Sequence, residues 1–204
     1  MLKANISVLV SGSGTNLQAL IDAQSSGVLK SGEIRLVISS AEDAGALLRA
    51  KDNGIARAVV PAKQTTREEF EAGISALLER HGTELIVLAG FMYILSADFV
   101  KARPGRIINV HPSLIPAFCG KGFYGLRVHE AALEYGVKVT GATVHYVNEI
   151  PDGGEIILQK AVRVKQNDTP ETLKKRVSEE AEHKLLPLAA ELVSRDIVRR
   201  RSSK

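Results

Sequence analysis

The sequence IINVHPSLIPAFCG, residues 107–120, joins an apolar strand pattern to a loop that Pro112 and Pro116 keep out of regular structure. Side chains alternate between the two faces of a strand, so Asn109 and His111 share one face. In an open α/β sheet, ligands bind in the crevice beyond the carboxyl ends of the strands. The segment therefore predicts an amide and an imidazole side by side at a catalytic edge, although a hydrogen-bonded loop histidine would give the same pattern.

Segments with strand character alternate with helical segments on the N-terminal side of residue 107. Each apolar run is typical of a strand buried on both faces, and the helices that follow have recognisable start or stop residues. Strands are expected at residues 6–10, 34–38, 58–60 and 84–89, and helices from residue 17, at 44–53, at 66–81 and after Ser96. This alternation predicts an α/β fold with a doubly wound, mostly parallel sheet.

The C-terminal half departs from this alternation. A helix at residues 128–135 precedes two long segments, 138–148 and 156–164, which a turn cluster containing Asp152 connects. These features predict an antiparallel strand addition to the sheet. Thr169 and Pro170 then begin a helix that we expect to end near Arg195, with residues 196–204 as a solvated basic tail.

The composition is that of an ordinary globular protein. Of the 204 residues, 45% are hydrophobic and 25% charged, which fits one domain. No apolar run reaches the roughly 18 to 20 residues that span a bilayer, no signal sequence is visible, and the single cysteine, Cys119, fits a reducing compartment. A net charge of +4 with 4% aromatic residues does not indicate a nucleic-acid surface. We therefore expect a cytoplasmic protein that binds neither nucleic acid nor membrane.

The sequence SGSGTN, residues 11–16, lies between the first strand and the first helix. A glycine-rich turn there leaves backbone N–H groups free at a helix N-terminus, where the dipole favours an anion. The stretch is not a P-loop, because Gly-Lys-Ser/Thr is missing, and Leu17 occupies the third glycine position of a dinucleotide fingerprint. Phosphate binding and a plain tight turn both remain open on this stretch alone, and the side-chain donors of Thr15 and Asn16 favour phosphate.

Other residues that could carry chemistry give weaker signals. The five histidines show no metal-ligand spacing, so no metal site is expected, and neither G-x-S-x-G nor a base beside Cys119 marks a nucleophile. His145, in the middle of a strand, is interpreted as a structural histidine, and Asp152 as either a turn residue or a functional carboxylate. The missing nucleophile favours direct transfer, with an acid or base and an oxyanion donor.

Several motifs together resemble the phosphoribosylglycinamide formyltransferases, the glycinamide ribonucleotide transformylases of purine synthesis. They are GSGTNLQAL, LAGFMYIL, INVHPSLIP, VTGATVHYV and DGGEIILQ, and they extend over almost the whole chain. The second half resembles the wider folate-dependent formyltransferase superfamily, and the N-terminal loop points to this member. The resemblance implies a Rossmann-like formyltransferase fold in a single domain, residues 1–204. Within it, residues 1–100 would bind the phosphate and nucleotide, residues 101–195 would hold the catalytic and folate-binding groups, and residues 196–204 would be the basic tail.

The resemblance also implies a reaction and a set of site residues. The formyl group of 10-formyltetrahydrofolate, a co-substrate, would pass to the amine of N1-(5-phospho-D-ribosyl)glycinamide in de novo purine synthesis. Matching the motifs residue by residue assigns catalytic roles to Asn109, His111 and Asp152, phosphate and ribose binding to Gly14, Thr15, Asn16 and Glu182, and folate binding to Arg67, Met92, Tyr93, Ile94, Leu95 and Asn109.

Two positions depart from the family pattern. Tyr93 stands where some members have arginine, and the spacing before Glu182 differs by one residue from that in some relatives. We expect Asn109 and a protonated His111 to stabilise the oxyanion, with Asp152 raising the pKa of His111 above its usual value of about 6.5.

The expected partners are small-molecule substrates, and the expected assembly is a monomer or a weak homodimer. Three other functions remain open. They are hydrolysis of the same folate, transfer to another amine, and a folate- or nucleotide-binding sensor without chemistry. A complete catalytic set argues against the sensor, because a binding protein does not need all three groups.

Overall fold

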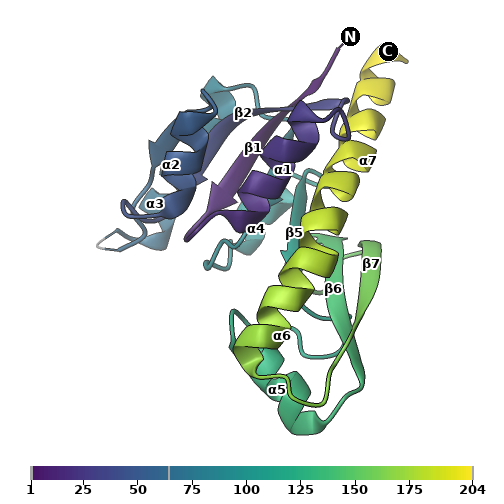
Figure 1. Cartoon of the computed structure of the whole chain (residues 1–204). Coiled ribbons are helices and arrows are strands. Elements are labelled where there is room, and N and C mark those ends of the chain that lie inside the picture. Colours follow the sequence, from purple (N-terminus) through teal and green to yellow (C-terminus); the bar gives the residue numbers. More distant parts are fainter. Residues whose placement is uncertain (1, 64, 204) are drawn as a thin grey trace.

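A mixed sheet forms the centre of the molecule, and the computed structural model describes residues 2–63 and 65–203. The seven strands have the order β3-β2-β1-β4-β5-β6-β7 (Figure 1). Five of them run parallel: β1 (Ala4–Val10), β2 (Gly32–Ser39), β3 (Ala56–Val59), β4 (Leu85–Leu88) and β5 (Ile107–His111). Strands β6 (Val139–Tyr146) and β7 (Ile156–Arg163) add an antiparallel pair beside β5.

Helices cover both faces of this sheet. On one face lie α1 (Thr15–Ser25), α2 (Gly45–Asp52) and α7 (His183–Ser202), and on the other lie α3 (Arg67–Arg80) and α4 (Ala97–Lys101). Helices α5 (Arg127–Tyr135) and α6 (Pro170–Val177) lie together at the end of the molecule away from the two termini (Figure 1). The predicted α/β class, doubly wound with an antiparallel addition, is confirmed.

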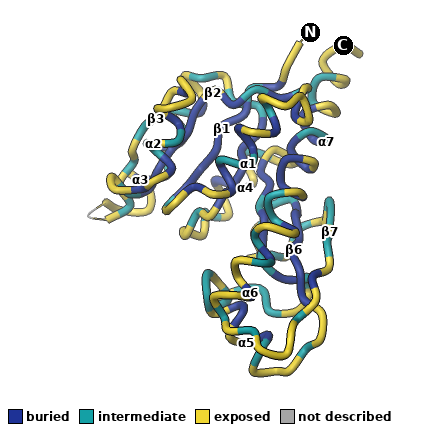
Figure 2. The backbone as a smooth tube through the Cα atoms, viewed as in Figure 1, coloured by how far each residue is buried: buried dark blue, intermediate teal, exposed yellow. Residues whose placement is uncertain are grey.

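Apolar side chains point to both faces of the central strands, so helices must pack on both faces of the sheet. In β1, Ile6, Val8 and Val10 belong to the cluster under α1, α2 and α7, whereas Leu9 belongs to the cluster under α3 and α4. Figure 2 shows the central strands buried along their length and the outer helix faces exposed. The helix predicted at residues 66–81 begins with a capping box, in which the Thr66 hydroxyl accepts from the backbone N–H of Glu69.

The C-terminal helix is longer than predicted, and the prediction that it ends near Arg195 is wrong. A π turn, η1 (Ser178–Glu182), joins α6 to α7, and α7 continues to Ser202. The basic residues therefore occupy the last helical turn, where the dipole favours cations. Arg201 donates to the backbone oxygen of Lys3 (2.7 Å) and lies 3.3 Å from the Glu84 carboxylate, so this segment is not a loose tail. Lys204, its predicted last residue, lies outside the described residues.

The strand order places the candidate site. β1 has β2 on one side and β4 on the other, so the chain changes direction across the sheet between β1 and β4. Loops that leave the carboxyl ends of neighbouring strands diverge at such a point and leave a crevice. The glycine-rich stretch follows β1, and the segment that contains Met92 to Leu95 follows β4.

Candidate active site

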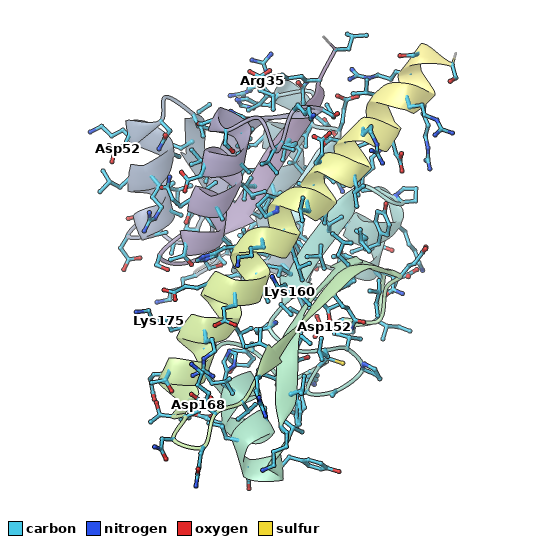
Figure 3. All side chains as sticks on the ribbon, turned by 45° about the vertical axis from the view of Figure 1, so that its right-hand side comes forward. Arg35, Asp52, Asp152, Lys160, Asp168 and Lys175 are labelled. Carbon is cyan, nitrogen blue, oxygen red and sulfur yellow. The ribbon has the colours of Figure 1, made fainter. Side chains whose placement is uncertain are left out.

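A cleft of about 720 Å³ opens at the carboxyl ends of β1, β4 and β5. The turn between β6 and β7, with Asp152 labelled in Figure 3, forms another wall, and α6 with η1 closes one side. Eleven predicted site residues line this cleft: Gly14, Thr15, Asn16, Met92, Tyr93, Ile94, Leu95, Asn109, His111, Asp152 and Glu182. Arg67 does not line it, but its guanidinium donates to the backbone oxygen of Ile94 (3.1 Å).

The amide of Asn109 is held by a histidine that the sequence did not mark as functional. Asn109 and His145 are directly paired residues of β5 and β6, and their Nδ2 and Nε2 atoms are 3.2 Å apart. His145 Nδ1 donates to the backbone oxygen of Tyr146 (2.8 Å), so in the neutral ring Nε2 accepts from Asn109. One amide hydrogen of Asn109 is thereby used, and the second is left for a ligand.

The Asp152 carboxylate lies between two imidazole rings. Its Oδ2 atom is 3.5 Å from His111 Nδ1, and its Oδ1 atom is 3.6 Å from His145 Nε2. The backbone N–H of Gly120 donates to Oδ2 (2.8 Å). On the other side of the His111 ring, Nε2 donates to the backbone oxygen of Phe118 (2.8 Å). The predicted catalytic trio is therefore brought together.

The charge state of the trio differs from the one that the sequence suggested. Burial lowers the pKa of His111 and outweighs the raising effect of Asp152, so the expectation of a raised pKa is wrong. Burial alone would raise the pKa of Asp152. The neighbouring imidazoles of His145 and His111, together with the Gly120 N–H, lower that pKa below its usual value. At neutral pH the site thus combines an ionised Asp152 with a neutral His111.

The turn that carries Asp152 is tightly built. Asp152 has a positive φ of 57°, a conformation that aspartate tolerates better than most residues. The side chain of Asn148 closes the turn by donating to the backbone oxygen of Gly153 (3.1 Å) and accepting from the backbone N–H of Ile150 (3.0 Å). A Cβ atom on Gly154 would lie 1.7 Å from the backbone oxygen of Tyr146, so glycine is required for this turn to reach β6.

The glycine-rich loop presents the N-terminus of α1 to the cleft. Gly14 caps the helix with a φ of 77°, and a Cβ atom there would lie 2.7 Å from Ala46 on α2. Only glycine meets both constraints. The first backbone N–H groups of a helix have no partner within it, so those of Thr15 and Asn16 are available to an anion.

Glu182 reaches this loop from the far end of the chain. The side chain of Asn16 donates to Glu182 Oε2 (3.1 Å) across 166 positions of sequence, and Ser178 donates to the same oxygen (3.1 Å). The π turn is the structural form that one extra residue takes within a helix, in agreement with the altered spacing before Glu182.

The segment after β4 forms an apolar wall of the cleft. Met92, Tyr93 and Ile94 are 52%, 38% and 56% exposed, an unusual concentration of open apolar surface that favours a ligand. Tyr93, at the position where some relatives have arginine, packs on Phe70 with ring centroids 5.3 Å apart. The Ser11 hydroxyl accepts from the backbone N–H of Met92 (3.0 Å) and so links this wall to the glycine-rich loop.

Several lining residues carried no usable signal in the sequence. His129 and Lys174 lie on α5 and α6, and Ser178 lies in η1. Their roles depend on how the helices pack, which periodicity does not reveal. His145 could have been found from the strand register, since a residue paired with Asn109 must share its face. Within the described part of the chain, no group of three or more His, Cys, Asp or Glu side chains could hold a metal ion.

The cleft at the switch point of the sheet contains an amide, an imidazole and a carboxylate, and no activated nucleophile is found among the described residues that line it. This set of groups is typical of an enzyme that transfers a group directly. Comparison with known proteins agrees. Residues 4–190 match the formyl transferase family, and the chain belongs to that family.

Individual relatives carry more specific names. Phosphoribosylglycinamide formyltransferase of Escherichia coli is 40% identical over 185 residues, which cover 90% of this chain and 84% of that protein. The trifunctional purine biosynthetic protein adenosine-3 of Gallus gallus is 47% identical over 193 residues, which cover 94% of this chain and 18% of that protein. The chain thus spans less than a fifth of the length of this trifunctional relative.

A solved structure shows the same fold. Glycinamide ribonucleotide transformylase 1 from Symbiobacterium toebii superposes with a TM-score of 0.88 at 41% identity, over 95% of this chain and 89% of that one. None of the helices in the described residues has the length and apolar character needed to cross a membrane.

Proposed function

We propose that this chain transfers the formyl group of 10-formyltetrahydrofolate to the amine of N1-(5-phospho-D-ribosyl)glycinamide. The products are formylglycinamide ribonucleotide and tetrahydrofolate, in de novo purine synthesis. The observation that supports the proposal is that Asn109, His111 and Asp152 line the same cleft as the N-terminus of α1 and an exposed apolar wall. The name and coverage of the Escherichia coli relative support the same reaction.

The ribonucleotide is assigned to the N-terminal side of the cleft. Its phosphate binds the free N–H groups at Gly14, Thr15 and Asn16, because a helix N-terminus with a close-approach glycine favours an anion. Its ribose hydroxyls bind the Glu182 carboxylate, which Asn16 ties to the same loop. This placement directs the glycinamide amine toward Asp152.

The folate is assigned to the apolar wall. Its pterin contacts the segment of Met92, Tyr93, Ile94 and Leu95. Arg67, which already holds the backbone of this segment, lies outside the cleft lining, so its folate contact involves the outer part of the molecule. Asn109 stands between the two substrates and contacts the formyl oxygen.

The reaction is a direct attack of the amine on the formyl carbon. A carbon–nitrogen bond to the glycinamide forms, and the tetrahedral oxyanion accepts the second amide hydrogen of Asn109. The ionised Asp152 accepts the proton of the attacking amine and delivers it, directly or through water, to the folate nitrogen as the old carbon–nitrogen bond breaks.

His111 is assigned a supporting part in this sequence. As a neutral ring it donates through Nε2, and that hydrogen is engaged by Phe118 in the structure without substrate. It reaches the oxyanion only when this loop contact exchanges for the formyl oxygen. In that position the neutral ring stabilises the negative charge as a hydrogen-bond donor and keeps its own proton.

The remaining expectations belong to the same proposal. We assign the nucleotide to the half formed by residues 1–100 and the chemistry and folate to residues 101–195. Small-molecule substrates fit the cleft, and a monomer or weak homodimer stays a prediction. A cytoplasmic location also stays a prediction, because one relative, from Arabidopsis thaliana, is named as chloroplastic.

The decisive experiment follows deformylation of the folate by absorbance, with and without glycinamide ribonucleotide. We expect deformylation that requires the ribonucleotide and yields formylated product in equal amount. Deformylation without the ribonucleotide would replace the proposal by a hydrolase or by transfer to another amine. Saturable binding without turnover would replace it by a sensor.

A further inference from the structure

The hydrogen bonds around Glu182 support an inference that rests on the function proposed above. We propose that Ser178 is a positioning residue that orients the Glu182 carboxylate toward the two neighbouring hydroxyls of the substrate ribose, and that the π turn η1 places it there. The proposal makes Ser178 a determinant of selectivity for ribose.

The π turn explains why Ser178 can reach two partners at once. In an α-helix, residues five positions apart point about 140° away from each other. In a π turn the hydrogen bonding is i to i+5, so such residues come to lie over one another. Ser178 and His183 are five positions apart, and the Ser178 hydroxyl lies 3.0 Å from His183 Nε2 and 3.1 Å from Glu182 Oε2.

The carboxylate of Glu182 is held on one side only. Ser178 and Asn16 both donate to Oε2, each at 3.1 Å. Two donors on a single oxygen restrict rotation of the carboxylate, and we infer that they leave Oε1 for the cleft that Glu182 lines. The Asn16 side-chain oxygen is buried without a hydrogen-bond partner in the described structure, which adds a second unused acceptor beside the carboxylate.

His183 supports this arrangement from outside the cleft. A serine hydroxyl has one hydrogen, which Ser178 gives to Glu182, so Ser178 accepts from His183 Nε2. His183 lines a separate groove between α1 and α7 and does not line the cleft. The hydrogen bonds thus form a chain from His183 through Ser178 to Glu182, in which each bond polarises the next.

The effects of burial and hydrogen bonding on the pKa of Glu182 explain why these hydrogen bonds matter. Burial raises the pKa of Glu182, while the hydrogen bonds from Asn16 and Ser178 act to lower it. Without the serine hydroxyl, the carboxylate would lose a donor that favours its ionised form and its fixed plane. A carboxylate with a fixed plane can accept from two neighbouring hydroxyls together, and a rotating one loses this pairing.

The test compares glycinamide ribonucleotide with its 2-deoxyribose analogue. In the wild-type protein we expect a clear preference for the ribose compound in kcat/KM. Ser178→Ala should reduce that preference about tenfold, through KM, with kcat changed less than about twofold. Glu182→Gln should reduce it further, and the double variant should match Glu182→Gln alone, since Ser178 acts through Glu182.

Two further variants keep the test decisive. Ser202→Ala removes a hydroxyl that bonds to the Val198 backbone in the last turn of α7, and it should change neither preference nor KM. His183→Ala removes the donor behind Ser178 without altering the cleft lining, and it should weaken the preference about threefold. If Ser178→Ala does not fold, His183→Ala still tests the effect on the ribose preference.

The outcomes separate this inference from the proposed function. A wild-type protein that does not formylate the ribonucleotide would overturn both. An active wild-type protein that loses its ribose preference in Glu182→Gln, but keeps it in both Ser178→Ala and His183→Ala, would overturn the positioning role alone. Loss of kcat with an unchanged ribose preference would show a merely structural serine.

Discussion

At the scale of single residues, Asn109 allows the sharpest test of the site. Its side chain has one amide hydrogen bonded to His145 and the other available to the oxyanion. Removing one oxyanion donor costs on the order of 100- to 1000-fold in rate. We expect Asn109→Ala to lower kcat by that factor while the affinity for the ribonucleotide, measured by calorimetry, changes little. Asn53→Ala, at the exposed end of α2, is the matched control, and near-normal turnover in Asn109→Ala would remove Asn109 from the mechanism.

Asp152 should be replaceable without loss of the fold. Asparagine keeps an oxygen that can accept from Gly120, and it tolerates the positive φ of 57° at this position. It lacks the negative charge that receives the amine proton. We therefore expect Asp152→Asn to lose most of its formyl transfer while its melting temperature stays within a few degrees of wild type. Asp43→Asn, in an exposed loop, is the control. A fully active Asp152→Asn protein would reduce Asp152 to a turn residue.

The residue-scale predictions from sequence chose residues that lie together, whereas the predicted direction of one pKa was wrong. Motif matching placed the trio, and the structure brings all three residues into one cleft. The direction of the His111 pKa was wrong, because it depends on how deeply the ring is buried. Burial depth comes from the packing of several segments, and no residue spacing reports it.

At the scale of elements, the start of α6 depends on a buried ion pair. Asp168 accepts from the backbone N–H of Lys165 (2.7 Å) and from Arg176 Nη1 (2.6 Å), and its side chain is 3% exposed. The hydrogen bond with Arg176 lowers the pKa of Asp168 to about 2. The stabilisation is therefore complete above the unfolded value of about 4 and is lost as the pH falls toward 2.

The matching variant is Asp168→Asn. We expect it to lower the free energy of unfolding by about 2 kcal/mol at pH 7, measured by urea denaturation. The difference from wild type should shrink as the pH falls from 4 to 2. Asp52→Asn, on the exposed end of α2 (labelled in Figure 3), should show neither effect. A difference that is independent of pH would show that Asp168 acts through its hydrogen-bonding shape and not through its charge.

The ends of helices could be predicted from the sequence where a residue that stops a helix was present. The helix predicted at residues 128–135 ends at Tyr135, because Gly136 after it takes the left-handed conformation that favours glycine. The helix that begins at Pro170 has no such stop near Arg195, and contacts of Arg201 with Lys3 and Glu84 extend it. Those partners come from the opposite end of the chain and from the residue before β4, so a local pattern could not include them.

At the scale of the whole molecule, alternation of strands and helices was enough for the fold class. The antiparallel pair also followed from two long alternating segments around one turn. The alternation did not predict the hydrogen bond between Asn16 and Glu182, which closes the cleft between α1 and η1. Such a contact exists only after α7 has crossed the face of the finished sheet (Figure 1).

The packing of distant segments around the cleft also buries a titratable group. Protonation of this group should govern the stability of the whole chain in mild acid. His129 on α5 is 1% exposed, its Nδ1 atom has no partner in the described structure, and burial, with Lys174 and His111 nearby, lowers its pKa to about 4. Between the unfolded pKa of about 6.5 and this value, the unfolded chain binds a proton that the folded protein excludes. Stability should therefore fall by about 2 to 3 kcal/mol over this interval through His129 alone.

His129→Gln replaces the imidazole by a side chain that does not titrate. Denaturation at pH 7, 6, 5 and about 4 should show a shallower loss of stability for this variant than for wild type, because only the other titratable groups, which are common to both proteins, then contribute. His81→Gln, at the half-buried end of α3, should keep the wild-type slope. If wild type and His129→Gln lose stability in parallel, the buried imidazole is not the acid-sensitive group. The acid response would then come from the other titratable groups, the carboxylates and the remaining histidines, and burial of His129 would not oppose its protonation.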